Sequence, residues 1–423
     1  MKTAAKDFKM TELGPIPKDW DVFELGENGH LVKNNVRPYT FANRVFAEYS
    51  MPAFDDGQQP DRVCGRTMLS ERNGIKGAVL LFNKLNVRKR RVWYVPDCEE
   101  NAVASGEFLA YVSDQVDLSL LRQILVTDKV TEDFEGMSCG TSNSQKRIAP
   151  NNFLEYCVAL PSRIEEQRKI AAALSEVDEM IAALEKLIEK KRKIKIGAMQ
   201  RLLTGKTRLP GFKGAWVEKR LGELGETYNG IGGKTKDDFG KGPARYITFL
   251  NVLTNPVLDE TLFEPVNVLP ADGQNRAKKG DLFFNTSSET PEEVGICSML
   301  ATDQAELYLN SFCFGFRLFD DNVSPLFLSY YFRSADGRLL MTTLAQGSTR
   351  YNLSKESFKE ACIVIPPSLA EQKAIAKVLG DIDEEIAALE AELAKTRQLK
   401  QGMMQELLTG KVRLSRVVTP VVE

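Results

Sequence analysis

The sequence predicts an α+β protein in which two mixed, mainly antiparallel-sheet globular domains alternate with two long helices. Residues 160–209 align without a gap on residues 365–414, and about half of the aligned positions are identical. Each of these segments has the heptad pattern of a paired helix. Each also follows a region of short apolar runs separated by turn residues, which is typical of antiparallel sheet. The chain is therefore organised around an internal repeat.

The first globular domain is predicted at residues 1–159. Its expected strands are 77–82 and 91–95, and a short helix is expected at 118–126. Near its start, Trp20 is followed by a Leu-Gly pair, and the same arrangement recurs at Trp216. The recurrence indicates that the two globular domains begin in a similar way.

The first long helix is predicted within 160–209. Pro161 stands where a helix can begin, Ser162 is a candidate N-cap, and Gly205 is a candidate left-handed C-cap. Apolar residues between these ends alternate in steps of four and three, as in a coiled-coil seam. They are Ile170, Leu174, Val177, Ile181, Leu184 and Ile188.

The second globular domain is predicted at 210–364 and the second helix within 365–414, with a short tail at 415–423. Expected strands are 246–250, 281–284 and 361–365, and an expected helix is 325–333. The second long helix repeats the signals of the first, with Ser368 and Gly410 at its ends and the seam Ile375, Leu379, Ile382, Ile386, Leu389 and Leu393. Neither helix can bury its apolar stripe alone, so we expect the two to pack on each other.

Composition excludes several classes of protein. The 423 residues contain seven cysteines without a C-x-x-C pair and a single histidine, His30, so no zinc or disulfide framework and no metal site is expected. No apolar run is long enough to span a membrane, and the basic segment Met1–Met10 lacks the apolar stretch of a signal peptide, so a cytoplasmic protein is expected. The net charge of −2 means that any contact with nucleic acid must use local basic clusters.

Motifs for catalysis are incomplete. A phosphate-binding loop ending at Gly233-Lys234-Thr235 would need glycine at Tyr228, and one ending at Gly205-Lys206-Thr207 would need glycine at Gln200. Nuclease carboxylate–lysine patterns and the base-gripping motif of an amino-methyltransferase are also missing. We therefore expect a chain without catalytic activity and without a cofactor of its own.

The paired segments resemble the helical regions of the specificity subunits of Type I restriction-modification systems. The most specific matches are Glu166-Gln167 with Glu371-Gln372, and Leu-Leu-Thr-Gly-Lys at 202–206 and 407–411. Softer matches are 13–20, Lys279–Leu282 and Gly347–Arg350, and Gly140-Thr141-Ser142 echoes the last of these loosely. The resemblance covers essentially the whole chain.

The resemblance implies two target recognition domains, each binding one half of a bipartite site in double-stranded DNA. The helices would form an antiparallel coiled coil with pseudo-two-fold symmetry that sets the spacer and docks two methyltransferase subunits. Those partners would supply S-adenosylmethionine, and restriction subunits would supply ATP and Mg-dependent cleavage. A helix from about residue 162 to 203 would be roughly 60 Å long, enough to hold two readers one DNA turn apart, about 34–36 Å.

Base and phosphate contacts are expected from basic and amide side chains on loops beside the sheets. We predict DNA contacts for Lys84, Asn86, Arg88, Arg90 and Arg91 in the first globular domain, and for Lys234, Lys236, Asn251, Asn285, Arg350 and Tyr351 in the second. The basic run 190–193 with Lys195 is interpreted as a solvated or spacer-facing helix surface.

Two other interpretations remain open. A coiled-coil adaptor that positions two protein-binding domains would show no affinity for DNA. An enzyme with an unfamiliar active site would show turnover by the isolated chain. Co-purification with a methyltransferase, followed by DNA binding that weakens steeply with salt, separates these possibilities.

Overall fold

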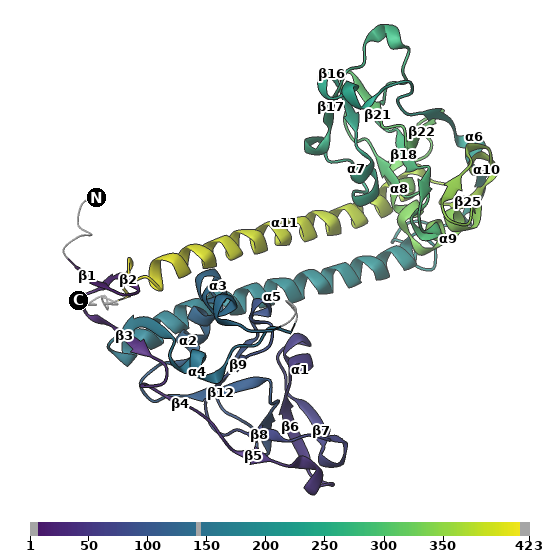
Figure 1. Cartoon of the computed structure of the whole chain (residues 1–423). Helices are drawn as coiled ribbons and strands as arrows, with labels where there is room; N and C mark the ends of the chain where they lie inside the picture. Colours follow the sequence, from purple (N-terminus) through teal and green to yellow (C-terminus); the bar gives the residue numbers. More distant parts are fainter. Residues whose placement is uncertain (1–6, 141–144, 415–423) are drawn as a thin grey trace, which may run out of the picture. The chain divides into compact units, whose positions relative to one another are not determined.

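The computed structural model describes residues 7–140 and 145–414, and the predicted tail 415–423 lies outside the described residues. The chain forms two compact units. The first contains the described residues up to Ala183 and those from Leu393 onward, and the second is Leu184–Glu392. Each unit therefore combines one globular domain with part of both long helices (Figure 1).

The first unit contains the following elements before its long helix: β1 (Phe8–Thr11), β2 (Gly14–Pro17), β3 (Trp20–Glu24), β4 (His30–Leu31), β5 (Asn35–Val36), β6 (Val45–Tyr49), α1 (Met51–Asp55), β7 (Asp61–Cys64), β8 (Arg72–Gly74), β9 (Val79–Asn83), β10 (Val92–Val95), β11 (Ala102–Ala104), β12 (Phe108–Val112), α2 (Leu118–Leu125), α3 (Asp128–Met137), α4 (Pro150–Leu154) and β13 (Cys157–Pro161). One sheet has the order β10-β9-β12-β4 and is antiparallel, and another has the order β5-β8-β11-β6-β7. The predicted strands and short helix correspond to β9, β10 and α2.

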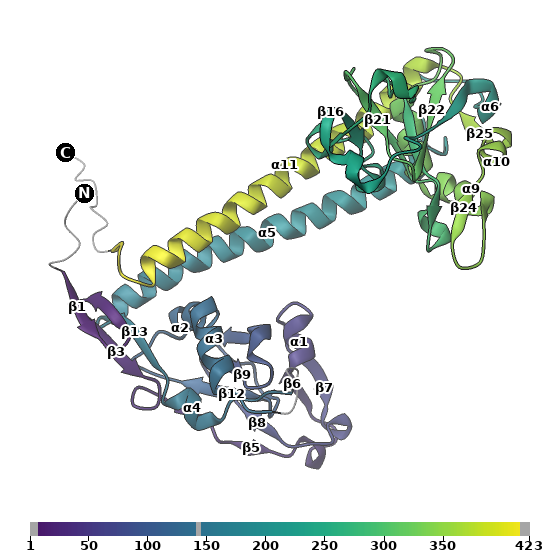
Figure 2. The ribbon, with the colours of Figure 1, turned by 45° about the horizontal axis from the view of Figure 1, so that its top comes forward.

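The long helix α5 (Ile164–Leu202) begins directly after β13, which pairs with β3. Ser162 is not its N-cap as predicted, because Arg163 separates it from the helix and its hydroxyl donates a 2.8 Å hydrogen bond to the carbonyl oxygen of Asp19. In both ribbon views α2 lies between the sheet and α5 (Figures 1 and 2). Ile170 and Leu174 belong to the same apolar core as Leu121 of α2. The first part of the heptad stripe is thus buried against the globular domain.

The second unit repeats this design with β14 (Val217–Arg220), α6 (Leu221–Leu224), β15 (Gly225–Asn229), β16 (Phe239–Ile247), α7 (Phe249–Thr254), β17 (Glu264–Val266), β18 (Leu282–Asn285), β19 (Ser287–Ser288), β20 (Cys297–Met299), β21 (Leu307–Leu309), β22 (Cys313–Leu318), α8 (Pro325–Arg333), α9 (Ala335–Leu344), β23 (Ala345–Gln346), β24 (Tyr351–Leu353), α10 (Lys355–Glu360), β25 (Cys362–Ile365) and α11 (Leu369–Leu407). Its main antiparallel sheet has the order β15-β22-β18-β20. The predicted strand 246–250 is wrong after Ile247, because the Thr248 side chain accepts a hydrogen bond from the Asn251 amide and starts α7.

The ends of the long helices confirm the predicted C-caps. Gly205 and Gly410 have φ of +69° and +67°, which glycine adopts without the steric cost that other residues meet. A Cβ on Gly410 would lie 2.3 Å from Pro17 Cγ. Leu407 is buried in the core of the first unit and Leu202 in the core of the second. Each helix therefore begins in the core of one globular domain and ends in the core of the other.

The helix segments run antiparallel within each unit. In the first, Asp178 of α5 pairs with Lys400 of α11, and in the second Lys191 of α5 pairs with Glu385 of α11. The predicted domain boundaries at 159/160 and 364/365 fall inside β13 and β25, which lead into the helices. Among the helices that the structure describes, none is apolar enough over 18 residues to cross a membrane.

Candidate nucleic-acid interface

The β9–β10 loop, residues 84–91, contains all the positions predicted for DNA contact in the first globular domain. Asn86 and Arg90 have φ of 53° and 48°, a left-handed conformation that costs a non-glycine residue on the order of 1–2 kcal/mol. Val87, between them, is buried and anchors the loop. Strained backbone of this kind is held only where surrounding contacts require it, and it is concentrated at functional sites.

The loop is fixed by neighbouring segments. Asn83, at the end of β9, is only 3% exposed, and its side-chain oxygen accepts a hydrogen bond from the Leu85 amide. The Asn86 amide donates to the Lys146 carbonyl at 2.9 Å, and the Lys84 carbonyl accepts from the Ile148 amide at 3.0 Å. The candidate interface therefore combines the loop 84–91 with the neighbouring segment 146–148. Thr141 and Ser142, which loosely echo the Gly347–Arg350 segment in the sequence, lie outside the described residues.

Arg91 is bound by a carboxylate of the same unit. Its Nε and Nη2 donate to the two Asp55 oxygens at 2.8 and 2.6 Å. The guanidinium hydrogen bond holds the pKa of Asp55 below its usual range. Arg88 and Arg90 form similar pairs with Glu135 and Asp128 of α3. The arginines predicted for DNA contact thus already have acidic partners, which sequence reasoning missed because they are remote along the chain.

Lysines complete the first interface. Lys84 is half-buried and Lys89 is exposed, and neither forms an ion pair with the residues that the structure describes. Lys89 and Asn86 also line a cavity of about 460 Å³ beside Met51 and Asp55. Lys89 is not among the contact residues predicted from the sequence. Lys84 and Lys89 can therefore reach a phosphate without first breaking an ion pair with another described residue.

The second globular domain has an equivalent arrangement. Asn285 ends β18, as Asn83 ends β9, and the loop after it carries β19, which pairs with β24. Likewise Leu85, in the loop after β9, pairs with Arg147. Each unit therefore has a loop after an inner strand that lies beside a hairpin nearer the C-terminus.

Charge distinguishes the two loops. Residues 84–91 contain Lys84, Arg88, Lys89, Arg90 and Arg91 and no acidic residue. The corresponding loop, residues 286–296, contains Glu289, Glu292 and Glu293 and no basic residue. The two interfaces therefore present different chemistry on similar frameworks.

Two predicted contact residues of the second domain are structural instead. Asn285 is fully buried; its amide nitrogen donates to the Glu293 carbonyl at 2.8 Å and its oxygen accepts from the Ile296 amide at 2.7 Å. Asn251 is also fully buried; its amide nitrogen donates to the Asp259 carbonyl and its side-chain oxygen accepts from the Asp259 amide. Buried amides with their donors and acceptors in use cannot reach a base edge. We therefore correct the prediction for Asn251 and Asn285.

The other predicted residues of this domain stay predictions. Arg350 is exposed and Tyr351 half-buried in the β23–β24 hairpin, where Tyr351 pairs with Ser288. Lys236 is exposed, whereas Lys234 donates to Asp272 at 2.6 Å. Lys355, not selected from the sequence, follows the hairpin and its ammonium group reaches the side chain of Asn229. The hairpin thus places Arg350 near the loop after β18.

The basic run on α5 faces the other helix in part. Lys191 pairs with Glu385 at 2.6 Å, Arg192 with Glu390 and Lys195 with Asp383, each at 2.5 Å. Lys193 instead pairs with Glu189 on its own helix. Lys191 and Lys195 are only 27% and 23% exposed, so these two are poorly placed to form a phosphate stripe. Within the described ranges, no group of three or more His, Cys, Asp or Glu residues could hold a metal ion.

Comparisons with known proteins agree with this architecture. Residues 213–399 match the family model for the Type I restriction modification DNA specificity domain. The chain is 25% identical to a putative type I restriction enzyme MjaX specificity subunit of Methanocaldococcus jannaschii, covering 97% of both chains. It is 27% identical to the MjaVIII specificity subunit of the same organism over 60% of this chain and 62% of the relative.

Solved structures share the fold. The crystal structure of a Type-I restriction-modification S subunit from M. genitalium superposes with a TM-score of 0.60 at 15% identity, covering 94% of this chain and 97% of the other. A chain from a structural study of complex assembly and conformational transition of the type I R-M system gives 0.55 at 18% identity, covering 94% and 99%.

Proposed function

Because the chain belongs to the family of type I restriction-modification specificity subunits, we propose that it reads a bipartite DNA site, one half with each globular domain. The observation that carries this proposal is the duplicated loop framework. A loop after an inner strand lies beside a hairpin in both units, while the side chains on the two loops differ. A conserved frame with different side chains is what two readers of different half-sites need.

In the first domain, the arginines exchange partners when DNA binds. Arg88 and Arg90 are 49% and 40% exposed, and exposed ion pairs contribute only about 0–1 kcal/mol. A phosphate or a guanine edge can therefore replace Glu135 or Asp128 at little cost. Lys84 and Lys89 bind phosphates directly, and the rigid backbone of residues 84–91 presents them in one geometry.

In the second domain, the acidic loop cannot lie against the phosphate backbone without repulsion. We assign its exposed carboxylate Glu289 to the groove, where an acceptor suits the amino group of cytosine. Arg350 and Lys236 then neutralise phosphates. This division leaves most of the counterion release, and so most of the salt dependence, with the first domain.

The long helices position the two readers and provide the docking surface for two methyltransferase subunits. The chain contributes specificity and no catalysis. S-adenosylmethionine belongs to the methyltransferase subunits, and ATP and Mg belong to restriction subunits where these are present. The complex acts on DNA in the cytoplasm.

The proposal is tested by expressing the chain with a partner methyltransferase subunit and measuring binding of the purified complex to a genomic DNA library at several salt concentrations. We expect enrichment of one asymmetric, interrupted sequence and an affinity that falls with salt. Co-purification without enrichment of any sequence would favour a coiled-coil adaptor. Modification by the isolated chain would favour an enzyme.

A further inference from the structure

A three-way contact in the second unit joins the globular domain to both long helices. Lys195 of α5 lies 2.5 Å from Asp383 of α11, and the hydroxyl of Tyr330 in α8 donates to the same carboxylate at 2.8 Å. The Lys195 ammonium also lies 5.6 Å from the centre of the Tyr330 ring. The Lys195 and Asp383 side chains are only 23% and 28% exposed, so the contact is partly shielded from water.

The first unit contains the corresponding contact, built from different residues of its globular domain. Lys400 of α11 lies 2.6 Å from Asp178 of α5. The Gln123 amide of α2 donates to Asp178 at 2.8 Å, and Arg122 donates at 3.2 Å. Asp178 and Lys195 are the repeat equivalents of Asp383 and Lys400. The helices thus repeat the ion pair, and each globular domain attaches to it with its own side chains.

Each domain has a second attachment beyond this contact. In the first unit, Arg413 bonds to Glu166 at 2.8 Å and also pairs with Asp19. In the second, Arg208 pairs with Glu371 and donates to the Gly214 carbonyl. Both arginines follow the C-terminal glycine of one long helix and bind the first turn of the other. Each globular domain is therefore attached to the helix pair at two positions: the Asp178 or Asp383 contact, and the arginine contact at the end of a long helix.

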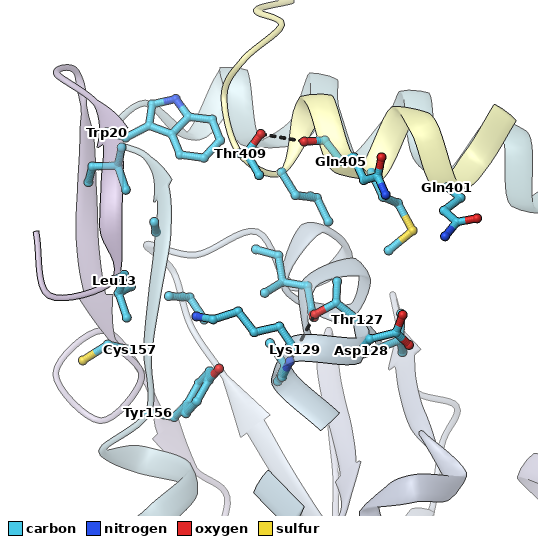
Figure 3. Close-up of a pocket in the computed structure, with 18 of the residues that line it drawn as sticks. Leu13, Trp20, Thr127, Asp128, Lys129, Tyr156, Cys157, Gln401, Gln405 and Thr409 are labelled. Atoms are coloured by element: carbon cyan, nitrogen blue, oxygen red, sulfur yellow. Dashed lines mark hydrogen bonds between the residues drawn. The ribbon is translucent and has the colours of Figure 1, made fainter. Parts of the chain in front are cut away.

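In the first unit, a cavity separates part of the globular domain from α11, although Leu407 of α11 is buried in the core of the domain. An open cavity of about 700 Å³ lies there, with Gln401 and Gln405 of α11 and Thr409 just after this helix on one side and Lys129 of α3 on the other (Figure 3). Lys400 lies on its border. Apolar packing of Ile170, Leu174 and Leu407 also joins the domain to the helices. The polar contact at Asp178, on the border of the cavity, adds a directional constraint on the orientation of the domain, because hydrogen bonds and ion pairs need a defined geometry.

We propose that Asp178 and Asp383 are positioning residues that fix the orientation of each globular domain on the paired helices and so determine which spacer length between half-sites is accepted. This inference rests on the proposed DNA-reading function. Neither residue touches a base in this account. Each acts by holding α2 or α8 against the ion pair between the helices, so that the reading loops of its domain keep one angle to the helix axis.

The test compares Lys195→Met with Lys193→Met in the complex with the methyltransferase subunit. The two lysines are two positions apart on α5, but among the described residues Lys193 pairs only with Glu189 of its own helix, and both side chains are more than 60% exposed. After the methylated sequence is identified for the unaltered complex, methylation rates are measured on duplexes with the native spacer and with spacers one base pair shorter or longer. The readout is the ratio between native and altered spacers.

We expect Lys195→Met and Asp383→Asn to lower this ratio about tenfold. A tenfold change corresponds to about 1.4 kcal/mol, which is the size expected for the loss of one charge-assisted contact. The half-site sequences should not change, and Lys193→Met should keep the ratio of the unaltered complex. The charge-reversed pair Lys195→Asp with Asp383→Lys should restore selectivity, because the Tyr330 hydroxyl can accept a hydrogen bond from a lysine.

A purely structural role predicts a different result: a lower melting temperature with an unchanged spacer ratio in every variant, and that result would overturn the inference. Lys400→Met provides an independent test in the first unit if the Asp383 variants fold poorly. Failure of the unaltered complex to methylate any interrupted sequence would instead contradict the proposed function itself.

Discussion

Inserting one helical turn into both long helices should lengthen the gap between the half-sites. We choose insertions of four residues after Lys186 and after Ala391, which are equivalent in the repeat and both lie in the second unit. Both helices must be changed, because Lys191–Glu385 and Lys195–Asp383 fix their register. A four-residue insertion shifts the heptad phase only slightly and is accommodated by local unwinding.

The expected size follows from helix geometry. Four residues add about 6 Å at about 1.5 Å per residue. At roughly 3.4 Å per base pair this is at most about two base pairs, which also turn the duplex by about 70°. Because the loops must follow that rotation, we expect the accepted spacer to grow by one to two base pairs while both half-sites stay the same.

The assay is sequencing of methylated adenines in DNA from cells that express the variant with the methyltransferase subunit. Deleting four residues at each of the same two positions is the reciprocal control and should shorten the spacer. A variant that methylates efficiently with the original spacer would refute the idea that the helices set the distance.

Three further predictions concern individual residues. Lys84→Ala and Lys89→Ala should each weaken DNA binding at all sequences and reduce the slope of log affinity against log salt by about 1. The control variant Lys193→Ala should leave this slope unchanged. Equal slopes for all three variants would exclude phosphate contacts by the lysines of the β9–β10 loop. Gly347→Ala should disturb the β23–β24 hairpin, because Gly347 has φ of +135° and an added Cβ would lie 2.1 Å from the Arg350 carbonyl oxygen. We expect loss of recognition at one half-site, measured on duplexes with one half-site altered at a time. Equal loss at both half-sites would contradict the assignment of this hairpin to a single half-site. The hydrogen bond from Arg413 holds the pKa of the Asp19 carboxyl below its usual range. The pair should therefore contribute stability above the pKa of the unfolded chain and lose it as the pH falls through the folded value. The melting temperatures of Asp19→Asn and the unaltered chain should converge at low pH, and a constant difference would rule out this linkage.

Local patterns predicted the long helices well. Their seams and glycine ends depend on neighbouring residues, and the repeat shows both signals twice. The start of the first helix was placed too early, because Pro161 ends β13 and α5 begins at Ile164. What the heptad pattern could not show is that Ile170, Leu174, Ile375 and Leu379 pack into the globular cores instead of only against the other helix. A stripe of apolar residues specifies that a surface is buried, but not which partner buries it.

The interface was harder to predict because it depends on contacts between distant residues. The sequence located the basic loop 84–91, yet the acids that bind its arginines lie on α1 and α3. Asn251 and Asn285 have the side chains of base readers, and only the fold shows that both are buried and bonded. Polar residue type alone therefore does not separate an amide that stabilises a loop from one that faces DNA.

The central claim is that the two globular domains read separate halves of one DNA site. It is tested most directly by replacing residues 210–364 with the corresponding domain of a relative of known target and sequencing the methylated adenines. We predict that one half-site changes to that of the relative while the other half-site and the spacer stay as they were. A change in both half-sites, or methylation of an uninterrupted sequence, would contradict the account.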